Sequence, residues 1–216
     1  QAKLLEKLAI ALANPGPREA SVRAAMNGGV GGSTHAASLM AALAIGAGQY
    51  GGAQEVSVCV SLWNKNGFDF DKWNHCLLCP NEHYQEDIWL PFEHAPGFDP
   101  NGIAFSSVSA GILNALSSLS EDGALAWLSQ NKEKLEAEMG YPLSLSGIAA
   151  AAFYDLGFDE KAAAYLYLIF RLPGAAVHAI EQEGMGWKKF PFFAENIVLK
   201  NDPGSMGIPE IRGLNI

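Results

Sequence analysis

The chain has 216 residues, of which 49% are hydrophobic and 17% are charged. A chain of this length and composition can bury a full hydrophobic core, which excludes intrinsic disorder as its main state. Its formal charge of −9, from 14 basic and 23 acidic residues, argues against nucleic-acid binding over the whole surface, because phosphate contacts need clustered Lys and Arg. We therefore expect one globular domain and no nucleic-acid partner.

Three cysteines, Cys59, Cys76 and Cys79, give an odd count, so they cannot all pair in disulfides within one chain. This favours a reducing compartment, and we expect a cytoplasmic protein. No apolar run reaches the length of a membrane span and no secretory signal is visible, so no membrane partner is expected. The first residue is Gln1 and not Met, as expected of a fragment or a trimmed product.

Apolar residues at helical spacing, together with helix-capping signals, predict an all-α architecture of nine or ten helices. In chain order, the predicted helices span residues 1–13, 20–26, 35–45, 53–63, 68–79, 84–89 (helix or turn), 106–116, 122–139, 143–154 and 160–178. The last two are rich in alanine and poor in charge, so we expect both to be buried on nearly all sides.

Some segments carry more specific expectations. A strand remains an alternative over 53–63, because that segment contains several β-branched valines. The glycines at 28–32 predict a sharp turn between close-packed helices. The charged run at 132–138 predicts a solvent-exposed helix face.

Three stretches carry motifs of small and polar residues at the ends of the predicted helices. They are residues 14–17 (Asn-Pro-Gly-Pro) with 48–53 (Gly-Gln-Tyr-Gly-Gly-Ala); 96–98 (Pro-Gly-Phe); and 145–147 (Leu-Ser-Gly) with 155–158 (Asp-Leu-Gly-Phe) and 178–182 (His-Ala-Ile-Glu-Gln). Taken together and in this order, they resemble motifs of the citrate synthase and citryl-CoA lyase family. The resemblance covers nearly the whole chain, and the third stretch is its most specific part.

The resemblance implies a citrate synthase-like helical bundle over residues 1–216, with a small lobe at about 60–140 and a large lobe formed by the remainder. The N-terminal helices of the family would be missing before Gln1. It further implies a homodimer, an acyl-CoA site in a cleft, and formation or cleavage of a C–C bond between an acyl-CoA and a 2-oxo acid or polycarboxylate. In that chemistry a carboxylate removes a proton from acetyl-CoA while histidines polarise the carbonyl groups.

The positions that match the catalytic residues of the family all differ. The aspartate base of the family is Ser146 here, and the histidine found before Gly-Gly-Ala in many members is Tyr50. The loop histidine is absent, because Asp99-Pro100-Asn101 follows the Pro-Gly-Phe motif, and the histidine of the first motif is Pro15. The sequence therefore leaves open whether the active site is lost or rebuilt, and with it whether the protein is an enzyme.

Candidates for a rebuilt catalytic site are Tyr50, His94, Asp99, Ser146 and His178. Four of them have a structural alternative: an aromatic plug for Tyr50, a turn cap for Asp99, a helix N-cap for Ser146, and a buried histidine satisfied by the backbone for His178.

Lys188, Lys189 and Arg171 are candidates for binding a substrate carboxylate, although a lysine lacks the bidentate fork of an arginine. The substrate implied by the resemblance is a coenzyme A ester, and no other organic cofactor is predicted.

A separate pattern, His75, Cys76, Cys79 and His83, offers four ligands for zinc. The spacing places the first three on one face of a helix. The alternatives are an apolar core helix with buried thiols and a redox-active dithiol.

Three hypotheses about function follow. The first is a citrate synthase-like enzyme that acts on an acyl-CoA with altered residues. The second is a catalytically silent family member that serves as a structural or regulatory subunit, as a homodimer or with a related chain. The third is a small metal-binding helical protein.

Overall fold

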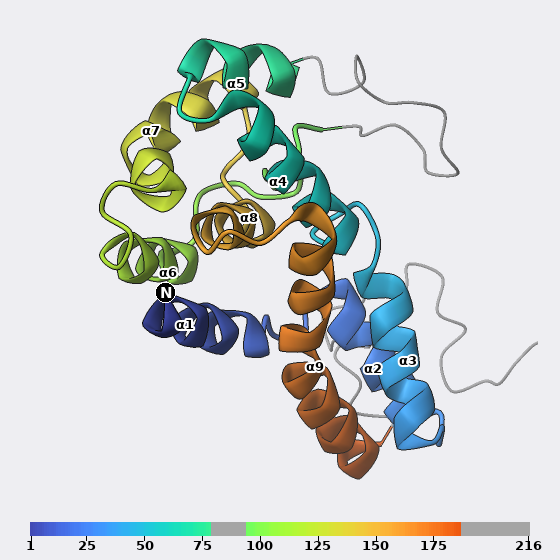
Figure 1. Ribbon diagram of the computed structural model, residues 1–216. Coiled ribbons are helices and arrows are strands. Elements are labelled where there is room, and N and C mark those ends of the chain that lie inside the picture. The colour runs from blue at the N-terminus through green and yellow to red at the C-terminus, as the bar shows by residue number, and fades with distance from the viewer. Residues whose placement is uncertain (79–93, 187–216) are drawn as a thin grey trace, which may run out of the picture.

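The computed structural model describes residues 1–78 and 94–186, and the chain forms nine α-helices within those two ranges (Figure 1). They are α1 (Ala2–Ala13), α2 (Ala20–Val30), α3 (His35–Gly46), α4 (Ala53–Asn66), α5 (Phe70–Leu78), α6 (Ser107–Ser117), α7 (Ala124–Met139), α8 (Leu145–Asp155) and α9 (Glu160–Met185). The all-α prediction is confirmed. The segment predicted as helix or turn at 84–89 lies outside the described residues.

Helix α8 is the centre of the bundle. It contacts α1, α4, α6, α7 and α9, which surround it in Figure 1. Every residue from Ser146 to Phe153 is buried, as the sequence predicted for this helix. Four consecutive alanines at 149–152 carry only a methyl group each, and this lets the neighbouring helices approach α8 on all sides.

Helix α9 is not buried on all sides, so that part of the prediction is wrong. Tyr165, Ile169 and Ile180 are all more than half exposed. The helix also continues through Pro173 and beyond the predicted end. By length and hydropathy alone it could cross a membrane, contrary to the sequence-based expectation. One side of it packs against α1, α2, α3 and α4.

The sequence predicted a sharp turn at the glycines of 28–32, but only part of this segment forms one. Helix α2 continues through Gly28 and Gly29 to Val30, and the turn begins only at Gly31. A Cβ atom on Gly29 would lie 2.3 Å from the carbonyl oxygen of Ala179 on α9. The glycine therefore permits close packing of two helices, which was the second half of the prediction.

Residues 53–66 form a helix and not a strand. Val56, Val60 and Trp63 are buried and follow one another at helical spacing, so their side chains share one face of α4. The β-branched residues that suggested a strand are accommodated because this face is buried against α8 and α9. Tertiary packing thus outweighs the weak β-propensity of the segment.

An aromatic cluster joins α4, α5, α7 and α8. The Trp63 ring lies 4.5 Å from that of Trp73, 5.5 Å from that of Trp127 and 5.7 Å from that of Tyr154, measured between centroids. Aromatic pairs at these distances add to the burial of apolar area. The cluster connects the segment predicted as a small lobe to the central helix, and the lobe boundary itself stays a prediction.

The charged face predicted at 132–138 is exposed except at Lys132 and Glu136, whose side chains are 19% and 18% exposed. Glu133, Lys134 and Glu138 are exposed. Glu136 instead accepts a hydrogen bond from the backbone N–H of Leu143 at 2.9 Å and pairs with Lys132. This carboxylate therefore holds the segment that leads into α8.

Asp155 supplies the N-terminal cap of α7 from a distant part of the chain. Gly123, at the N-cap position, has no side chain, and Asp155 accepts hydrogen bonds from the N–H groups of Ala124 and Leu125 and from Ser120 Oγ. We expect Asp155→Ala to lower the free energy of unfolding by about 2 kcal/mol, because the N–H groups lose their acceptor.

Urea unfolding followed by circular dichroism measures this change. Glu133→Ala, an exposed substitution on α7, is the control and should stay within about 0.5 kcal/mol of the unmodified protein. Equal midpoints for the Asp155 and Glu133 variants would refute the capping role.

Candidate functional site

A cavity of about 530 Å³ opens beside the N-terminal ends of α4 and α8. It also borders the C-terminal end of α1, the start of α2 and the loop from 94 to 106. Its lining brings together five of the predicted site residues: Tyr50, His94, Asp99, Ser146 and Arg171. We call this cavity the cleft.

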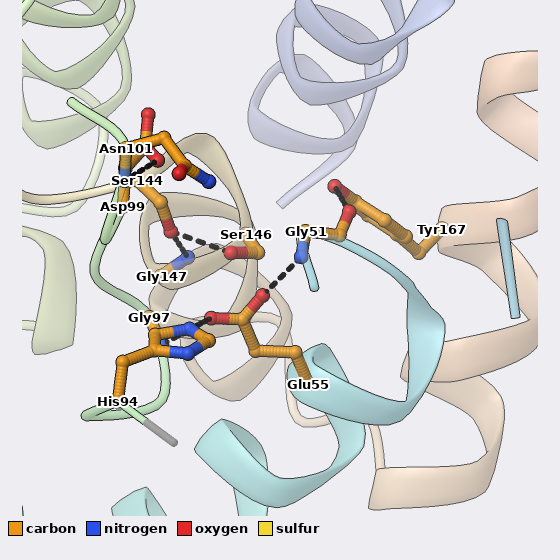
Figure 2. A network of polar contacts seen from close by, with 10 residues as sticks. All are labelled: Gly51, Glu55, His94, Gly97, Asp99, Asn101, Ser144, Ser146, Gly147 and Tyr167. Atoms are coloured by element: carbon orange, nitrogen blue, oxygen red, sulfur yellow. Dashed lines mark hydrogen bonds and ion pairs between the residues drawn. The ribbon is translucent and has the colours of Figure 1, made fainter. Parts of the chain in front are cut away.

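Glu55, which the sequence analysis did not select, lies at the base of the cleft. Its carboxylate accepts hydrogen bonds from the backbone N–H of Gly51 at 2.6 Å and of Gly97 at 2.7 Å (Figure 2). The residue is 1% exposed and occupies the first turn of α4, where the helix dipole stabilises a negative charge. Burial and the charge of Glu55 both raise the pKa of the Cys59 thiol one turn further along α4.

His94 is paired with this carboxylate. Its Nε2 lies 3.5 Å from Glu55 Oε1, and both side chains are almost fully buried. The Tyr50 ring stacks on the imidazole with 5.3 Å between the ring centroids, while Tyr50 itself is 56% exposed. Tyr50 therefore covers one face of the His94 ring, which agrees with its structural alternative as an aromatic plug.

Two glycines let the loop that carries His94 approach α8. Gly97 has a φ of +87°, and its Cα lies 3.1 Å from the point where a Cβ on Gly147 would sit. The Gly97 carbonyl accepts a hydrogen bond from the N–H of Ser144 at 2.9 Å, and Asp99 N–H donates to the carbonyl of Pro142 at 2.8 Å. These contacts fix the His94 loop against the start of α8.

Ser146 does not cap α8, contrary to its predicted structural alternative. The N-cap is Ser144, whose Oγ accepts a hydrogen bond from the N–H of Gly147. Ser146 lies within the first turn and is 1% exposed, and its Oγ is 2.5 Å from Ser144 Oγ. The two hydroxyl groups therefore form one hydrogen-bonded unit facing Glu55 across the site (Figure 2).

Asp99 holds a turn at the rim of the cleft. Its Oδ1 accepts a hydrogen bond from the N–H of Asn101 at 2.9 Å, and its carbonyl accepts one from Gly102 at 3.1 Å. The side chain is exposed. This agrees with the turn cap named as its alternative.

Arg171 lies in the wall of the cleft, and both of its terminal nitrogens have partners there. Its Nη2 is 2.7 Å from Glu19 Oε1, and its Nη1 donates to the carbonyl of Gly51 at 2.8 Å. The guanidinium lies 4.7 Å from the centroid of the Tyr167 ring. Burial raises the pKa of Tyr167 to about 12, so this phenol keeps its proton and donates it to Gly51 O at 2.8 Å.

His178 is not among the residues that line the cleft. Its two ring nitrogens lie 3.0 Å from Asn14 Oδ1 and 3.0 Å from Glu181 Oε2. The histidine is thus satisfied by side chains and not by the backbone, and it ties α9 to the end of α1.

Only two of the four candidate zinc ligands, His75 and Cys76, lie within the described residues. His75 is exposed, whereas Cys76 is buried with its Sγ 3.6 Å from Asn66 Oδ1. Cys79 and His83 lie outside the described residues, so the quartet stays a prediction. Within 1–78 and 94–186, no three His, Cys, Asp or Glu side chains form a group that could hold a metal ion. Lys188 and Lys189 also lie outside the described residues.

Glu19 and Glu55 are the two site residues that sequence reasoning missed. Each had a local signal, since both lie at the start of a helix: Glu19 is the N-cap of α2, and Glu55 is three residues beyond the N-cap Gly52. An acidic residue at such a position usually only caps its own helix. Their contacts with Arg171 and Gly97 come from remote segments, which local patterns do not reveal.

No known family model and no curated protein matches this sequence. Solved structures do match. Citryl-CoA lyase from Hydrogenobacter thermophilus is similar with a TM-score of 0.62 and 19% identity, covering 96% of this chain and 77% of that chain. ATP citrate lyase from Methanothrix soehngenii, in complex with citrate and coenzyme A, gives a TM-score of 0.64 and 17% identity, covering 92% of this chain and 34% of that chain.

A mutant of Methanosaeta concilii ATP citrate lyase in complex with (3S)-citryl-CoA gives the same TM-score of 0.64, at 18% identity, and also covers 92% of this chain and 34% of that chain. The chain thus spans about a third of the length of these ATP citrate lyase chains. These similarities show that the protein has the citrate synthase-like fold of the citryl-CoA lyase type, which the sequence motifs had predicted.

The Glu19 carboxylate links the stability of the fold to pH. Burial, the largest influence, raises its pKa, but the charge of Arg171 and the hydrogen bonds from Ser21 and Val22 together hold the pKa below its ordinary value of 4.5. Because the folded pKa is depressed, Glu19 stabilises the fold above pH 4.5, and this contribution is lost as the pH falls through the folded pKa.

We therefore expect Glu19→Gln to be less stable than the unmodified protein at neutral pH, with the difference shrinking below pH 4.5. Denaturant unfolding at a series of pH values measures this. The exposed variant Glu133→Gln serves as the control, and its small effect should not depend on pH in that way. A Glu19→Gln difference that stays constant with pH would contradict the pairing.

Proposed function

We propose that this protein binds a coenzyme A thioester in the cleft and breaks or forms a C–C bond in its acyl group, with His94 as the acid–base group. The observation that carries the proposal is the buried pair of Glu55 and His94 at the base of the cleft, 3.5 Å apart. The similarity in fold to citryl-CoA lyase supports the reaction class.

Burial of such a pair argues for a function. Taking a carboxylate and an imidazole out of water costs folding free energy, and a purely structural contact is better made by apolar side chains. Titratable groups gathered in a cleft are typical of active sites. Glu55 is held by two backbone N–H groups, so it can orient the imidazole.

In the direction of cleavage, the substrate is a 3-hydroxyacyl thioester. His94 takes the proton of the 3-hydroxyl group, the C2–C3 bond breaks, and C3 becomes a carbonyl carbon. The electron pair of the broken bond moves into the thioester as an enolate, and His94 returns the proton to C2. The products are a carbonyl compound and the shortened acyl thioester, so atoms and electrons balance.

The hydroxyl pair of Ser144 and Ser146 has a role in this scheme. Ser146 stands where the resemblance places the carboxylate base of the family, and it cannot take over that role at neutral pH. The hydrogen bond between the two hydroxyl groups uses one of their two protons, so the other proton can be donated to a third group. We assign it to the enolate oxygen of the thioester, where a donor stabilises the developing charge.

The test combines binding and turnover. Acetyl-CoA at about 100 times its dissociation constant should stabilise the fold by about 2.7 kcal/mol, measured by thermal shift and calorimetry. Release of acetyl-CoA from a panel of 3-hydroxyacyl-CoA esters, including citryl-CoA, measures turnover. We expect His94→Gln to lower kcat by about 100-fold or more while acetyl-CoA still binds.

His35→Gln is the matched control, because His35 is exposed and pairs with Glu183, away from the cleft. It should leave turnover unchanged. Unchanged turnover in His94→Gln would remove His94 from the mechanism. Absence of thioester binding in the unmodified protein would reject the proposal as a whole.

A catalytically silent subunit is the second candidate, and one specific observation favours it. By the resemblance, Ser146 occupies the position of the aspartate base of the family. The carboxylate of Asp99 does not replace that base, because it caps a turn. Thioester binding without turnover on any ester of the panel would support this candidate over an enzyme.

We also propose a homodimer. Two helices that contact each other, α3 and α9, both expose large apolar side chains, including Met40 and Ile45 on α3 and Ile169 and Ile180 on α9. Apolar side chains gathered in this way are typical of a subunit interface. Light scattering after size-exclusion chromatography should give twice the mass of 23.0 kDa. The monomer mass, or a stable complex only with a related chain, would contradict it.

A further inference from the structure

The charges in the cleft do not suit a polycarboxylate. Among the described residues that line it, three carboxylates, those of Glu19, Glu55 and Asp99, stand against the single guanidinium of Arg171. A protonated His94 would add one positive charge beside Glu55 and still leave the balance negative. A ligand with several carboxylates would therefore meet repulsion in the cleft.

The one guanidinium of this lining is already occupied. Nη2 of Arg171 pairs with Glu19 Oε1 at 2.7 Å, and Nη1 donates to Gly51 O at 2.8 Å. The third nitrogen, Nε, is buried and has no hydrogen-bond partner among the described residues. The Arg171 side chain is only 6% exposed and lies over Tyr167. Arg171 therefore has no pair of free N–H groups that could bind the carboxylate of a ligand.

Glu19 is itself held firmly in place. It is the N-cap of α2, and its Oε2 accepts hydrogen bonds from Val22 N–H at 3.0 Å and from Ser21 Oγ. The start of a helix favours a negative charge, as does Arg171. A ligand carboxylate would have to displace a residue that caps a helix and neutralises a buried arginine at the same time.

We propose that Glu19 occupies, from within the chain, the place on Arg171 that a substrate carboxylate would otherwise take, so that the cleft selects thioesters whose acyl group carries no carboxylate. Glu19 is thus a specificity-determining residue. This inference rests on the proposed function and narrows its substrate class. The neutral polar groups of Asn101, Ser106 and Ser144 in the lining suit hydroxyl and carbonyl groups of an uncharged acyl chain.

The experiment compares two thioesters that match in chain length. Butyryl-CoA ends in a methyl group where succinyl-CoA carries a carboxylate. By calorimetry at neutral pH, the unmodified protein should bind butyryl-CoA about tenfold or more tighter than succinyl-CoA. Glu19→Gln keeps an oxygen that can accept from Val22 N–H but loses the charge, so it should reduce this preference about tenfold or reverse it.

Asp159→Asn is the matched control. Asp159 is also a helix N-cap carboxylate, accepting from Ala162 N–H at 2.7 Å, and it does not line the cleft. This variant should keep the preference of the unmodified protein. If Asp159→Asn shifts the preference as much as Glu19→Gln does, a general change in charge explains the effect and the inference is overturned.

The outcomes separate this inference from the function on which it rests. Equal affinity for the two esters in the unmodified protein, or a preference for succinyl-CoA, overturns the selectivity while thioester binding stands. Failure of both esters to bind overturns the proposed function, and the inference falls with it. Because the comparison in the unmodified protein needs no variant, it decides the question even if Glu19→Gln does not fold.

Discussion

The cleft depends on one buried carboxylate. Glu55 accepts the N–H of Gly51 from the turn before α4 and the N–H of Gly97 from the loop that carries His94. The start of α4 and a loop that lies 42 positions further along the chain therefore meet at the two oxygen atoms of this carboxylate (Figure 2). Without this anion, two buried N–H groups would lose their acceptor and His94 would lose its partner, so the base of the cleft could not keep this geometry.

The Gly51 peptide extends the same network to α9. Its N–H donates to Glu55, while its carbonyl accepts from both Tyr167 and Arg171. Arg171 in turn neutralises Glu19 at the start of α2. Charges of alternating sign thus run through the wall of the cleft, and each is paired where it is buried. This pairing consumes the positive charge of Arg171, which a carboxylate ligand would need.

Much of the architecture could be predicted from local patterns. The stripe of Leu4, Leu8 and Leu12 on α1, the Thr34 cap of α3 and the end of α1 before Pro15 depend on residues close together in the chain. The structure also brings Tyr50, His94 and Ser146, three of the candidate site residues, into the lining of one cleft. Predictions failed where distant packing decides. Helix α2 continues through Gly29, which lies directly against α9, and α9 is partly exposed because no described helix covers its outer face.

The amino-acid sequence by itself predicted an all-α chain, from the spacing of its apolar residues and its helix-capping signals. The resemblance of its motifs predicted the citrate synthase-like fold. Only the tertiary structure decided which charges pair. Glu55 accepts a hydrogen bond from Gly97, which is 42 positions away in the sequence. Glu19 forms an ion pair with Arg171, which is on a helix far along the chain. Both carboxylates look like ordinary helix caps until folding removes water and leaves these partners within hydrogen-bonding distance.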